Sequence, residues 1–434
     1  MKFIYIETYG CSANINNSEI MKGLLKQSGY EITNNLKIAD ILIINSCVVK
    51  GKTESKIKRR IQDLSKEFPN KLMIISGCMP ETDFLSLKKI NPKLLFLGIH
   101  HVKDISQLIS DYFNNEFNSI KQKQYLSRQN EEKILLPKIP ENKLISIIQI
   151  SEGCNGQCSY CLTRLAKGNL FSYHQNKIIK TIENDLNSGA KEIWLTSQDC
   201  AAYGLDRGKQ ELPELLNKIL NLKHNFKLRL GMMNPNNVYP ILDQLIQIYK
   251  NKKMYKFLHI PIQSASNKIL KDMNRHYVLE QVESIIKKFK EEFPEITLST
   301  DIITAYPNET NEDHEKNLEF VRNFKPEVFN LSKFSSHKQT KAGKLKPLDI
   351  EIINKRSSEL MELHRKTAEK NKQKLKNKNI NVFINKKIGE NLYESRDENY
   401  NIILINSNDR SILGKNIKVR IIQTGVHHLI GKLE

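Results

Sequence analysis

Residues 150–161 read I-S-E-G-C-N-G-Q-C-S-Y-C, and this segment decides how the rest of the chain is interpreted. It places Cys154, Cys158 and Cys161 in a C-x₃-C-x₂-C spacing, directly after an apolar run at residues 144–150 that predicts a buried strand. A loop at the end of such a strand can wrap three thiolates around one metal centre. Iron–sulfur cubanes usually take four cysteines, so a cluster held by these three would keep one iron open. An open position distinguishes a reactive metal site from a structural one.

The same three cysteines could instead form a zinc knuckle. Zinc modules usually pair a C-x₂-C with a second pair of ligands about a dozen or more residues further along. No C-x₂-C or H-x₃-H pair follows Cys161 in this sequence. The spacing, with Tyr160 just before the third cysteine, resembles the radical S-adenosylmethionine (radical-SAM) superfamily.

The chain has 434 residues, which is enough for two or three domains with well-formed cores. After Met1 the sequence alternates polar and apolar residues and lacks the apolar core of a secretory signal. No apolar run approaches the roughly eighteen residues that a membrane helix needs. We therefore expect a cytoplasmic protein with no membrane partner, and we treat it as a monomer. In such a chain the seven cysteines are metal ligands or buried thiols rather than disulfides.

The charge of the chain suggests a polyanionic partner. Its formal net charge is +20, from 68 Lys and Arg against 48 Asp and Glu. Residues 337–387 contain 15 Lys and Arg but only 5 Asp and Glu, so this span carries half of the excess. A solvated, lysine-rich helix face is the alternative interpretation. The small β-domain predicted next to the span favours RNA.

Three further cysteines follow three apolar runs in the N-terminal third. Continuous Ile and Leu runs alternate with amphipathic helices and predict a parallel sheet, in which the loops after the strands gather at one edge. Cys11, Cys47 and Cys78 each lie just after a strand, and Gly10 and Gly77 precede two of them, as expected where backbone passes close to a bulky centre. One such cysteine is more often a small buried hydrophobe. Three at one edge indicate a second metal site. The predicted strands are 2–8, 39–45, 71–76 and 94–98, and the predicted helices are 18–28 and 53–68.

The middle of the chain repeats strand and helix. Six strands with intervening helices suggest an open or partial (β/α)₆ barrel, since a full barrel needs eight. Polar residues follow these strands where a nucleoside cofactor bearing an amino acid would need hydrogen-bond partners, although each could be a cap or turn residue. Cys200 has no partner at ligand spacing and is interpreted as a bystander. The strands are 144–150, 192–196, 227–232, 257–262, 297–303 and 328–333, and the polar residues are Ser197, Gln198, Asp199, Asn234, Gln263, Ser264 and Asp301.

The C-terminal part predicts a long helix and a small β-barrel. Residues 348–378 have the apolar spacing of a helix, and five short strand-like segments follow in about fifty residues, as in oligonucleotide-binding barrels. A structural cap is the alternative interpretation of this barrel. We therefore predict an α/β protein with a parallel-sheet domain (1–120), a linker (121–142), a partial-barrel domain (143–370) and a C-terminal β-barrel (371–434).

Several segments together resemble one family over nearly the whole chain. They are similar to radical-SAM methylthiotransferases, and more narrowly to the archaeal and eukaryotic branch that acts on N6-threonylcarbamoyladenosine beside the tRNA anticodon, at position 37. The C-terminal barrel resembles the TRAM domain of that family. The matching segments are T-Y-G-C-S-A-N (8–14), I-N-S-C-V-V-K (44–50), S-G-C-M-P-E (76–81), K-G-N-L-F-S-Y (167–173), E-I-W-L-T-S-Q-D (192–199), F-L-H-I-P-I-Q-S-A-S (257–266) and M-N-R-H-Y (273–277).

The resemblance implies two 4Fe–4S clusters and S-adenosylmethionine as cofactors. The cluster on Cys154, Cys158 and Cys161 would bind and reductively cleave S-adenosylmethionine, and the resulting radical would remove the C2 hydrogen of the modified adenosine. The cluster on Cys11, Cys47 and Cys78 would carry the sulfur or methylthio group, and a second S-adenosylmethionine would supply the methyl. The implied partners are tRNA, a low-potential ferredoxin- or flavodoxin-like electron donor, and a sulfur donor. Contacts to the cofactor are expected from Tyr160, Ser197, Gln198, Asp199, Gln263 and Asp301.

The chain departs from the family pattern at two places. Ala305 and Asn308 replace glycines in D-I-I-T-A-Y-P-N-E-T, and residues 335–342 read S-S-H-K-Q-T-K-A where the family has a proline- and glycine-rich segment. These changes affect the expected pocket rather than the cluster ligands. Two other functions are kept as alternatives. One is methylthiolation of a different target, either isopentenyladenosine in tRNA or a ribosomal-protein aspartate. The other is a non-catalytic, metal-containing RNA-binding protein.

Overall fold

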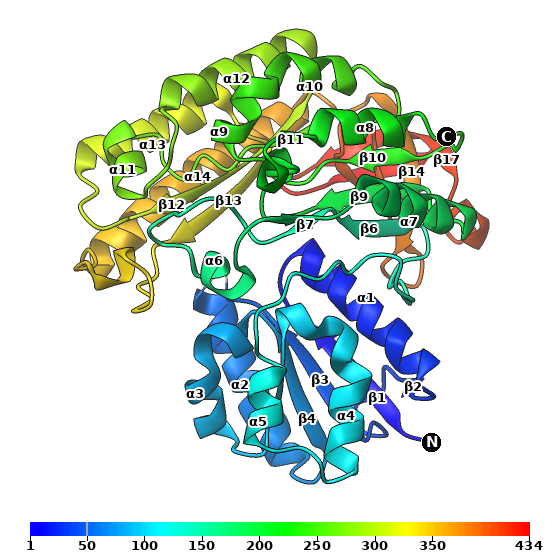
Figure 1. Cartoon of the computed structure of the whole chain (residues 1–434). Helices are drawn as coiled ribbons and strands as arrows, with labels where there is room; N and C mark the ends of the chain where they lie inside the picture. Colours follow the sequence, from blue (N-terminus) through cyan, green and yellow to red (C-terminus); the bar gives the residue numbers. More distant parts are fainter. Residues whose placement is uncertain (49–50) are drawn as a thin grey trace.

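The computed structural model describes residues 1–48 and 51–434, so Val49 and Lys50 of the segment 44–50 lie outside the described residues. The chain forms an N-terminal α/β domain, a central partial barrel and a small C-terminal β-barrel, which confirms the expected fold class. Figure 1 shows the N-terminal domain (blue to cyan) below the other two, with helix α6 at the junction. Among the described residues, no helix combines the length and apolar character needed to cross a membrane.

The N-terminal domain is a five-stranded sheet in the order β2-β1-β3-β4-β5, and all of its pairs are parallel. Ile and Leu side chains fill both faces, because helices cover each side of the sheet. Helices α1 and α4 pack on one face, while α2 and α3 pack on the other. The elements are β1 (Phe3–Thr8), α1 (Ser12–Gln27), β2 (Glu31–Ile32), β3 (Ile41–Ser46), α2 (Gly51–Glu67), β4 (Leu72–Gly77), α3 (Met79–Ile90), β5 (Leu95–Gly98) and α4 (Ile105–Phe113).

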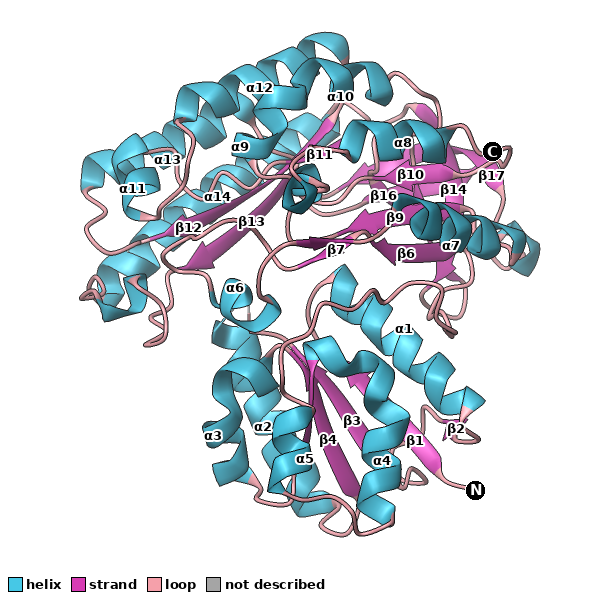
Figure 2. Cartoon of the chain, viewed as in Figure 1, coloured by secondary structure: helices cyan, strands magenta, loops and turns pink. Residues whose placement is uncertain are grey.

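The central domain contains the six expected parallel strands in two hydrogen-bonded groups, β6-β9-β10 and β11-β12-β13. A bridge between Leu228 and Met254 and a hydrogen bond from Met233 N to His259 O (3.0 Å) join β10 to the β11 side. The result is an open half-barrel with helices on its outer face (Figure 2). The strands are β6 (Ile145–Gln149), β9 (Glu192–Thr196), β10 (Lys227–Arg229), β11 (Phe257–His259), β12 (Thr297–Thr304) and β13 (Val328–Lys333). The outer helices are α7 (Gln175–Asn187), α8 (Leu212–Leu220), α10 (Leu242–Tyr249), α12 (Leu279–Glu292) and α13 (Asn311–Phe324).

The C-terminal domain is a closed five-stranded barrel in the order β14-β15-β16-β18-β17, and the long helix α14 (Ile350–Gln373) leads into it. The barrel docks at the starts of the central strands. Asn385 Nδ2 donates to Glu192 Oε1 (2.9 Å), and the Tyr400 ring lies 4.9 Å from Tyr255 and 4.8 Å from Phe257. The opposite ends of the central strands are left for the cysteine loop. The strands are β14 (Asn379–Lys387), β15 (Leu392–Arg396), β16 (Ile402–Asn406), β17 (Asn416–Thr424) and β18 (Leu429–Leu433).

The segment predicted as a linker is packed rather than extended. It begins within the short helix α5 (Ser119–Gln124), and Lys133 and Ile134 are buried. Further along, Ile139 N donates to Glu19 O (2.9 Å), so the segment lies along α1. Its polar composition suggested solvent, but Lys133 forms a buried ion pair with Glu152 of the central domain.

Candidate functional site

Cys11, Cys47 and Cys78, here called the N-terminal cysteine triad, lie at the ends of the neighbouring strands β1, β3 and β4. Strands β3 and β4 pair Ser46 with Gly77, so Cys47 and Cys78 are the next residues in register, on strands about 4.8 Å apart. Cys11 is the N-cap residue of α1 and Cys78 is that of α3. The positive ends of these helices favour negative charge on both sulfur atoms.

The N-terminal cysteine triad shares one electrostatic environment. Burial raises the pKa of the Cys78 thiol to about 12; charge on Lys167 lowers that pKa, while charge on Cys47 and Cys11 raises it. The expected edge with three thiols is therefore formed.

Gly10 lies against Cys47, and the expected approach of its backbone to an inorganic centre stays a prediction. Its φ is +110°, and a Cβ placed on it would lie 2.7 Å from Cys47 Cβ and 2.9 Å from Cys47 Sγ. Gly77 has a φ of +88°, and a Cβ there would lie 2.3 Å from the carbonyl oxygen of Ser46. The two glycines therefore let β1 and β4 close onto the loop that carries Cys47.

A second group of cysteines, here called the loop cysteine triad, consists of Cys154, Cys158 and Cys161. It lies in a long loop, the cysteine excursion, whose two ends are joined by a short pair of strands. Strands β7 (Ser151–Glu152) and β8 (Phe171–Ser172) pair antiparallel, and neither was predicted, because two-residue strands carry no period-2 signal. Gly156 N donates to Cys154 Sγ (3.3 Å), and a Cβ on Gly156 would lie 3.4 Å from Cys154 Sγ and 3.8 Å from Cys158 Sγ.

The loop cysteine triad is also electrostatically coupled. Burial raises the pKa of Cys154 to about 12, and charge on Asp199, Cys161 and Cys158 acts in the same direction. Burial likewise raises the pKa of Cys161, and charge on Cys158 raises it further. A bound cation would favour the thiolate forms of Cys78, Cys154 and Cys161, whose pKa values burial raises.

Helix α6 (Leu162–Lys167) connects the two triads. Cys161 is its N-cap residue, while Leu162 and Ala166 pack into the same hydrophobic core as Cys47 and Cys78. The helix also packs against α3, whose N-cap is Cys78. One short helix therefore begins at one triad and is embedded beside the other, at the junction seen in Figure 1.

Arg275 is a site residue that the sequence reasoning missed. Its guanidinium donates to Cys158 Sγ (3.2 Å), to Asn234 Oδ1 (2.9 Å) and to the Tyr277 hydroxyl (3.1 Å). Charge-assisted donation to sulfur favours the thiolate and fixes the loop against β10 and β11. The only sequence signal was its place in M-N-R-H-Y, because the contact spans 117 residues.

The polar residues after β9 differ in their partners: some are bonded within the protein, and one keeps an acceptor for a ligand. Asp199 caps the following turn at Ala201 N (3.1 Å) and accepts bonds from Asn234 N (3.0 Å) and Asn237 Nδ2 (2.6 Å), so its carboxylate is engaged by protein groups. The Ser197 hydroxyl accepts from Asp199 N (3.0 Å). Gln198 Oε1 is buried without a hydrogen-bond partner among the described residues. Gln198 therefore keeps an acceptor for a ligand, as buried polar atoms are normally satisfied.

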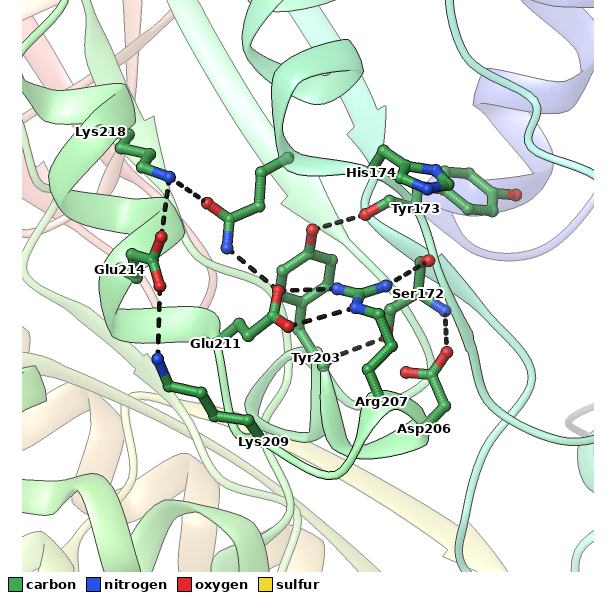
Figure 3. Close-up of polar contacts among 12 residues, drawn as sticks. Ser172, Tyr173, His174, Tyr203, Asp206, Arg207, Lys209, Glu211, Glu214 and Lys218 are labelled. Carbon is green, nitrogen blue, oxygen red and sulfur yellow. Dashed lines mark hydrogen bonds and ion pairs between the residues drawn. The ribbon is translucent and has the colours of Figure 1, made fainter.

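The loop that follows is fastened to the base of the cysteine excursion (Figure 3). The Arg207 guanidinium bridges Glu211 Oε2 (2.8 Å) and the carbonyl of Ser172 (2.7 Å). Ser172 N donates to Asp206 Oδ2 (2.9 Å), and the Tyr203 hydroxyl donates to the carbonyl of Tyr173. These bonds hold residues 202–206 against β8.

Gln263 and Asp301 are two further predicted residues, of which Gln263 follows β11 and Asp301 lies within β12. His259 Nε2 and Asp301 Oδ2 are 2.6 Å apart across the two strands, and both side chains are partly accessible. Gln263 has a φ of +64°, and its N–H donates to Asp301 O (2.8 Å). His259 was not predicted. Tyr160 is half-buried and packs with the core of Ile269, Met273, Tyr306, Phe334 and Ala342.

The segment 335–342, where the family pattern is lost, lies at the junction of the domains. Ala342 N donates to Ser159 O (2.8 Å), and Gln339 Nε2 donates to the carbonyl of Thr82 in α3. Ala305 and Asn308, the other departure, have φ values of +58° and +66°. The backbone thus keeps the conformation that favours glycine although both positions carry a Cβ.

The donor sets fit three-thiol iron–sulfur sites. Each triad offers three sulfur ligands, glycines that allow close approach, and cationic or helix N-terminal groups beside the sulfur atoms. Within residues 1–48 and 51–434, no three His, Cys, Asp or Glu side chains converge closely enough to hold a single metal ion. A cubane makes a different demand, because each of its thiolates binds a different iron atom.

Comparison with known proteins identifies both main domains. Residues 3–98 match a family model described as Uncharacterized protein family UPF0004, and residues 148–321 match the Radical SAM superfamily. In solved structures, the radical S-adenosylmethionine methyltransferase TsrM of Kitasatospora setae superposes with a TM-score of 0.59 at 12% identity, covering 79% of this chain and 77% of that chain. The radical enzyme OxsB superposes with a TM-score of 0.56 at 11% identity, covering 84% of this chain and 56% of that chain. At this identity the likeness concerns the fold alone.

Relatives with higher identity cover most of the chain. A Methanothermobacter thermautotrophicus protein named "Probable threonylcarbamoyladenosine tRNA methylthiotransferase" is 37% identical over 372 residues, 86% of each chain. An Archaeoglobus fulgidus protein of the same name is 35% identical over 99% of this chain and 98% of its own. The Homo sapiens threonylcarbamoyladenosine tRNA methylthiotransferase is 31% identical over 99% of this chain and 73% of its own length. The chain therefore belongs to the threonylcarbamoyladenosine tRNA methylthiotransferase family.

Proposed function

We propose that this protein is a radical-SAM enzyme that adds a methylthio group at C2 of N6-threonylcarbamoyladenosine at position 37 of tRNA. The observation that carries the proposal is the placement of two cysteine triads at one junction, linked by α6. A reaction that makes a radical at one centre and delivers sulfur from another needs such proximity. The family membership supplies the class of nucleoside.

The residues present would hold two 4Fe–4S clusters and S-adenosylmethionine. When bound, these groups supply an organic radical able to remove an unactivated hydrogen and a sulfur donor to replace it. Arg275 fixes Cys158 by its bond to Sγ (3.2 Å) and ties the loop to Asn234. Gln198 offers a ligand its buried Oε1, which has no hydrogen-bond partner among the described residues. Asp199 acts through the backbone by holding Asn234 N (3.0 Å), and is a positioning residue.

The pair His259–Asp301 is proposed to contact the bound nucleoside or cofactor from β11 and β12. The carboxylate orients the imidazole at 2.6 Å, which leaves Nδ1 of His259 for a ligand. The walls of the same space would be formed by Tyr160, Ser197 and Gln263, which would act through their shape and backbone position.

The tRNA would bind across the basic span and the C-terminal barrel. Of the Lys and Arg residues between 337 and 387, all except Arg356 and Lys372 are exposed, so the span presents its charge to solvent. Phosphate contacts by such residues supply most sequence-independent affinity for nucleic acid. We also propose the division into residues 1–120, 121–142, 143–370 and 371–434, and helix α14 extends to Gln373. A low-potential electron donor and a sulfur donor complete the proposed partners, in the cytoplasm.

Nucleoside analysis tests the proposal. Transfer RNA from a strain lacking the gene is digested and analysed by mass spectrometry, with complementation by the wild type or by Cys158→Ala. We expect the methylthio form of N6-threonylcarbamoyladenosine to disappear, to return with the wild type and to stay absent with the variant. If that nucleoside is unchanged while methylthiolated isopentenyladenosine or a ribosomal-protein aspartate is lost, the substrate assignment is wrong. A chain that binds RNA but leaves every methylthio product unchanged would point to the non-catalytic alternative.

A further inference from the structure

Two lysines and one glutamate form a buried ion network outside the residues assigned above. Glu152 Oε1 lies 2.6 Å from Lys167 Nζ, and Glu152 Oε2 contacts Lys133 Nζ. The exposed fractions are 2% for Lys167, 3% for Glu152 and 4% for Lys133. The three residues come from the end of α6, from β7 and from the segment predicted as a linker.

With both lysines protonated, the network contains one more cation than anion. Burying an unbalanced charge is costly unless another group compensates it. The neighbouring His100 is neutral at pH 7, since burial lowers its pKa to about 4. Glu81 is the next acidic neighbour, but burial raises its pKa to about 7 and it forms no ion pair among the described residues, so it balances the network only in part.

The thiols of the N-terminal cysteine triad lie within the electrostatic reach of this excess charge. Burial alone would lower the pKa of Lys167, but Glu152, then Cys78, then Cys11 raise it above its usual value. Burial lowers the pKa of Lys133 and is the largest influence on it, while charge on Cys78 acts in the opposite direction. A cluster bound by three thiolates would bring the negative charge that the network lacks. Lys167 follows Ala166 in α6, and Ala166 packs into the same hydrophobic core as Cys47 and Cys78, so this lysine lies on the helix that borders the triad.

We propose that Lys167 is a positioning residue for the second cluster: a buried counter-charge that raises the reduction potential of the cluster assigned to the N-terminal cysteine triad. This inference rests on the proposed function, because it needs a cluster on that triad. A nearby positive charge stabilises the more negative, reduced form of a cluster, and net charge is one of the determinants of cluster potential. Glu152 then limits the effect by neutralising one of the two lysines.

Substitutions that remove or restore charge in the full-length chain test this effect on the reduction potential. Cys154, Cys158 and Cys161 are first replaced by alanine, so that only the second cluster can assemble. After anaerobic reconstitution, the potential is measured by redox titration followed by electron paramagnetic resonance. We expect Lys167→Met to shift the midpoint to more negative values and Glu152→Gln to shift it to more positive values. The double variant restores the original charge and should return the midpoint towards that of the parent, and Lys167→Arg should match the parent.

Lys138→Met is the matched control, because Lys138 forms a part-buried ion pair with Asp185 (2.5 Å) in the same region but does not belong to the network. It should leave the midpoint unchanged. Equal midpoints in the Lys167→Met and Glu152→Gln chains, or shifts of the same sign, would overturn the inference while leaving a cluster on the triad. A parent chain that binds no iron would instead overturn the second cluster itself, and the inference with it.

Discussion

Gly10→Ala perturbs the N-terminal cysteine triad without touching a cysteine. The added Cβ would lie 2.7 Å from Cys47 Cβ and 2.9 Å from Cys47 Sγ, and the φ of +110° is unfavourable for alanine. Gly29→Ala is the matched control in the same domain. Gly29 has a φ of +85°, but a Cβ there meets nothing within 4 Å. The pair therefore separates backbone strain from displacement of Cys47.

The two variants should differ in magnitude. A positive φ costs an L-residue about 1–2 kcal/mol, and alanine recovers about 0.4–1 kcal/mol by restricting the unfolded chain, so Gly29→Ala should lose about 1 kcal/mol or less. Overpacking adds about 1–3 kcal/mol, which brings the expected loss for Gly10→Ala to about 1–4 kcal/mol. If the displaced sulfur is a cluster ligand, Gly10→Ala should also lose roughly half of the iron, and Gly29→Ala should keep it.

Hydrogen exchange of the β3 and β4 amides, with iron analysis after reconstitution, measures both effects. Local exchange reports the stability of the N-terminal domain without assuming that the whole chain unfolds in one step. Equal iron contents and equal exchange in the two variants would refute the reasoning, because the Cβ contact with Cys47 would then have no consequence.

Three other substitutions probe separate features. Arg275→Met should destabilise the chain by about 1–3 kcal/mol and slow S-adenosylmethionine cleavage at least about tenfold, because Cys158 Sγ loses its donor (3.2 Å). The control Arg207→Met changes the loop shown in Figure 3 and should retain cleavage. Equal cleavage rates in the two variants would contradict the role of Arg275. Ala305→Gly should stabilise the chain by up to about 1 kcal/mol in thermal unfolding, since its φ is +58°; a lower melting temperature would show that the conformation is not strained. Burial raises the pKa of Glu19 to about 7, above its unfolded value, so its ionisation costs stability above pH 7 and the cost disappears below about pH 4.5. Glu19→Gln should therefore be about 3 kcal/mol more stable than the wild type at pH 8 but not at pH 4.5 in urea titrations, and a constant difference would contradict this.

The sequence was sufficient for the fold class and for the edge that carries the N-terminal cysteine triad. Uninterrupted runs such as residues 39–45 and 71–76 identify buried parallel strands, and parallel strands bring the following residues to one edge. The observed β3 and β4 end within one residue of these predictions, which places Cys47 and Cys78 side by side.

Contacts between side chains far apart in sequence were not predictable. Arg275 reaches Cys158 across 117 residues, and Lys133 is buried although it lies in a polar segment that favours a linker. The same limit applies to Asp199, whose predicted cofactor contact stays a prediction, because the pattern did not indicate its bonds to Ala201, Asn234 and Asn237. Composition and periodicity report burial and element type, but not which partner a polar side chain meets.

Iron content and cofactor cleavage in the wild type beside Cys47→Ala test the central claim that both cysteine triads hold clusters. Each protein is reconstituted anaerobically, analysed for iron, then reduced with S-adenosylmethionine and assayed for 5′-deoxyadenosine. The account predicts about eight irons in the wild type and about four in Cys47→Ala, with 5′-deoxyadenosine formed by both. Equal iron in the two proteins, at about four per chain, would contradict it.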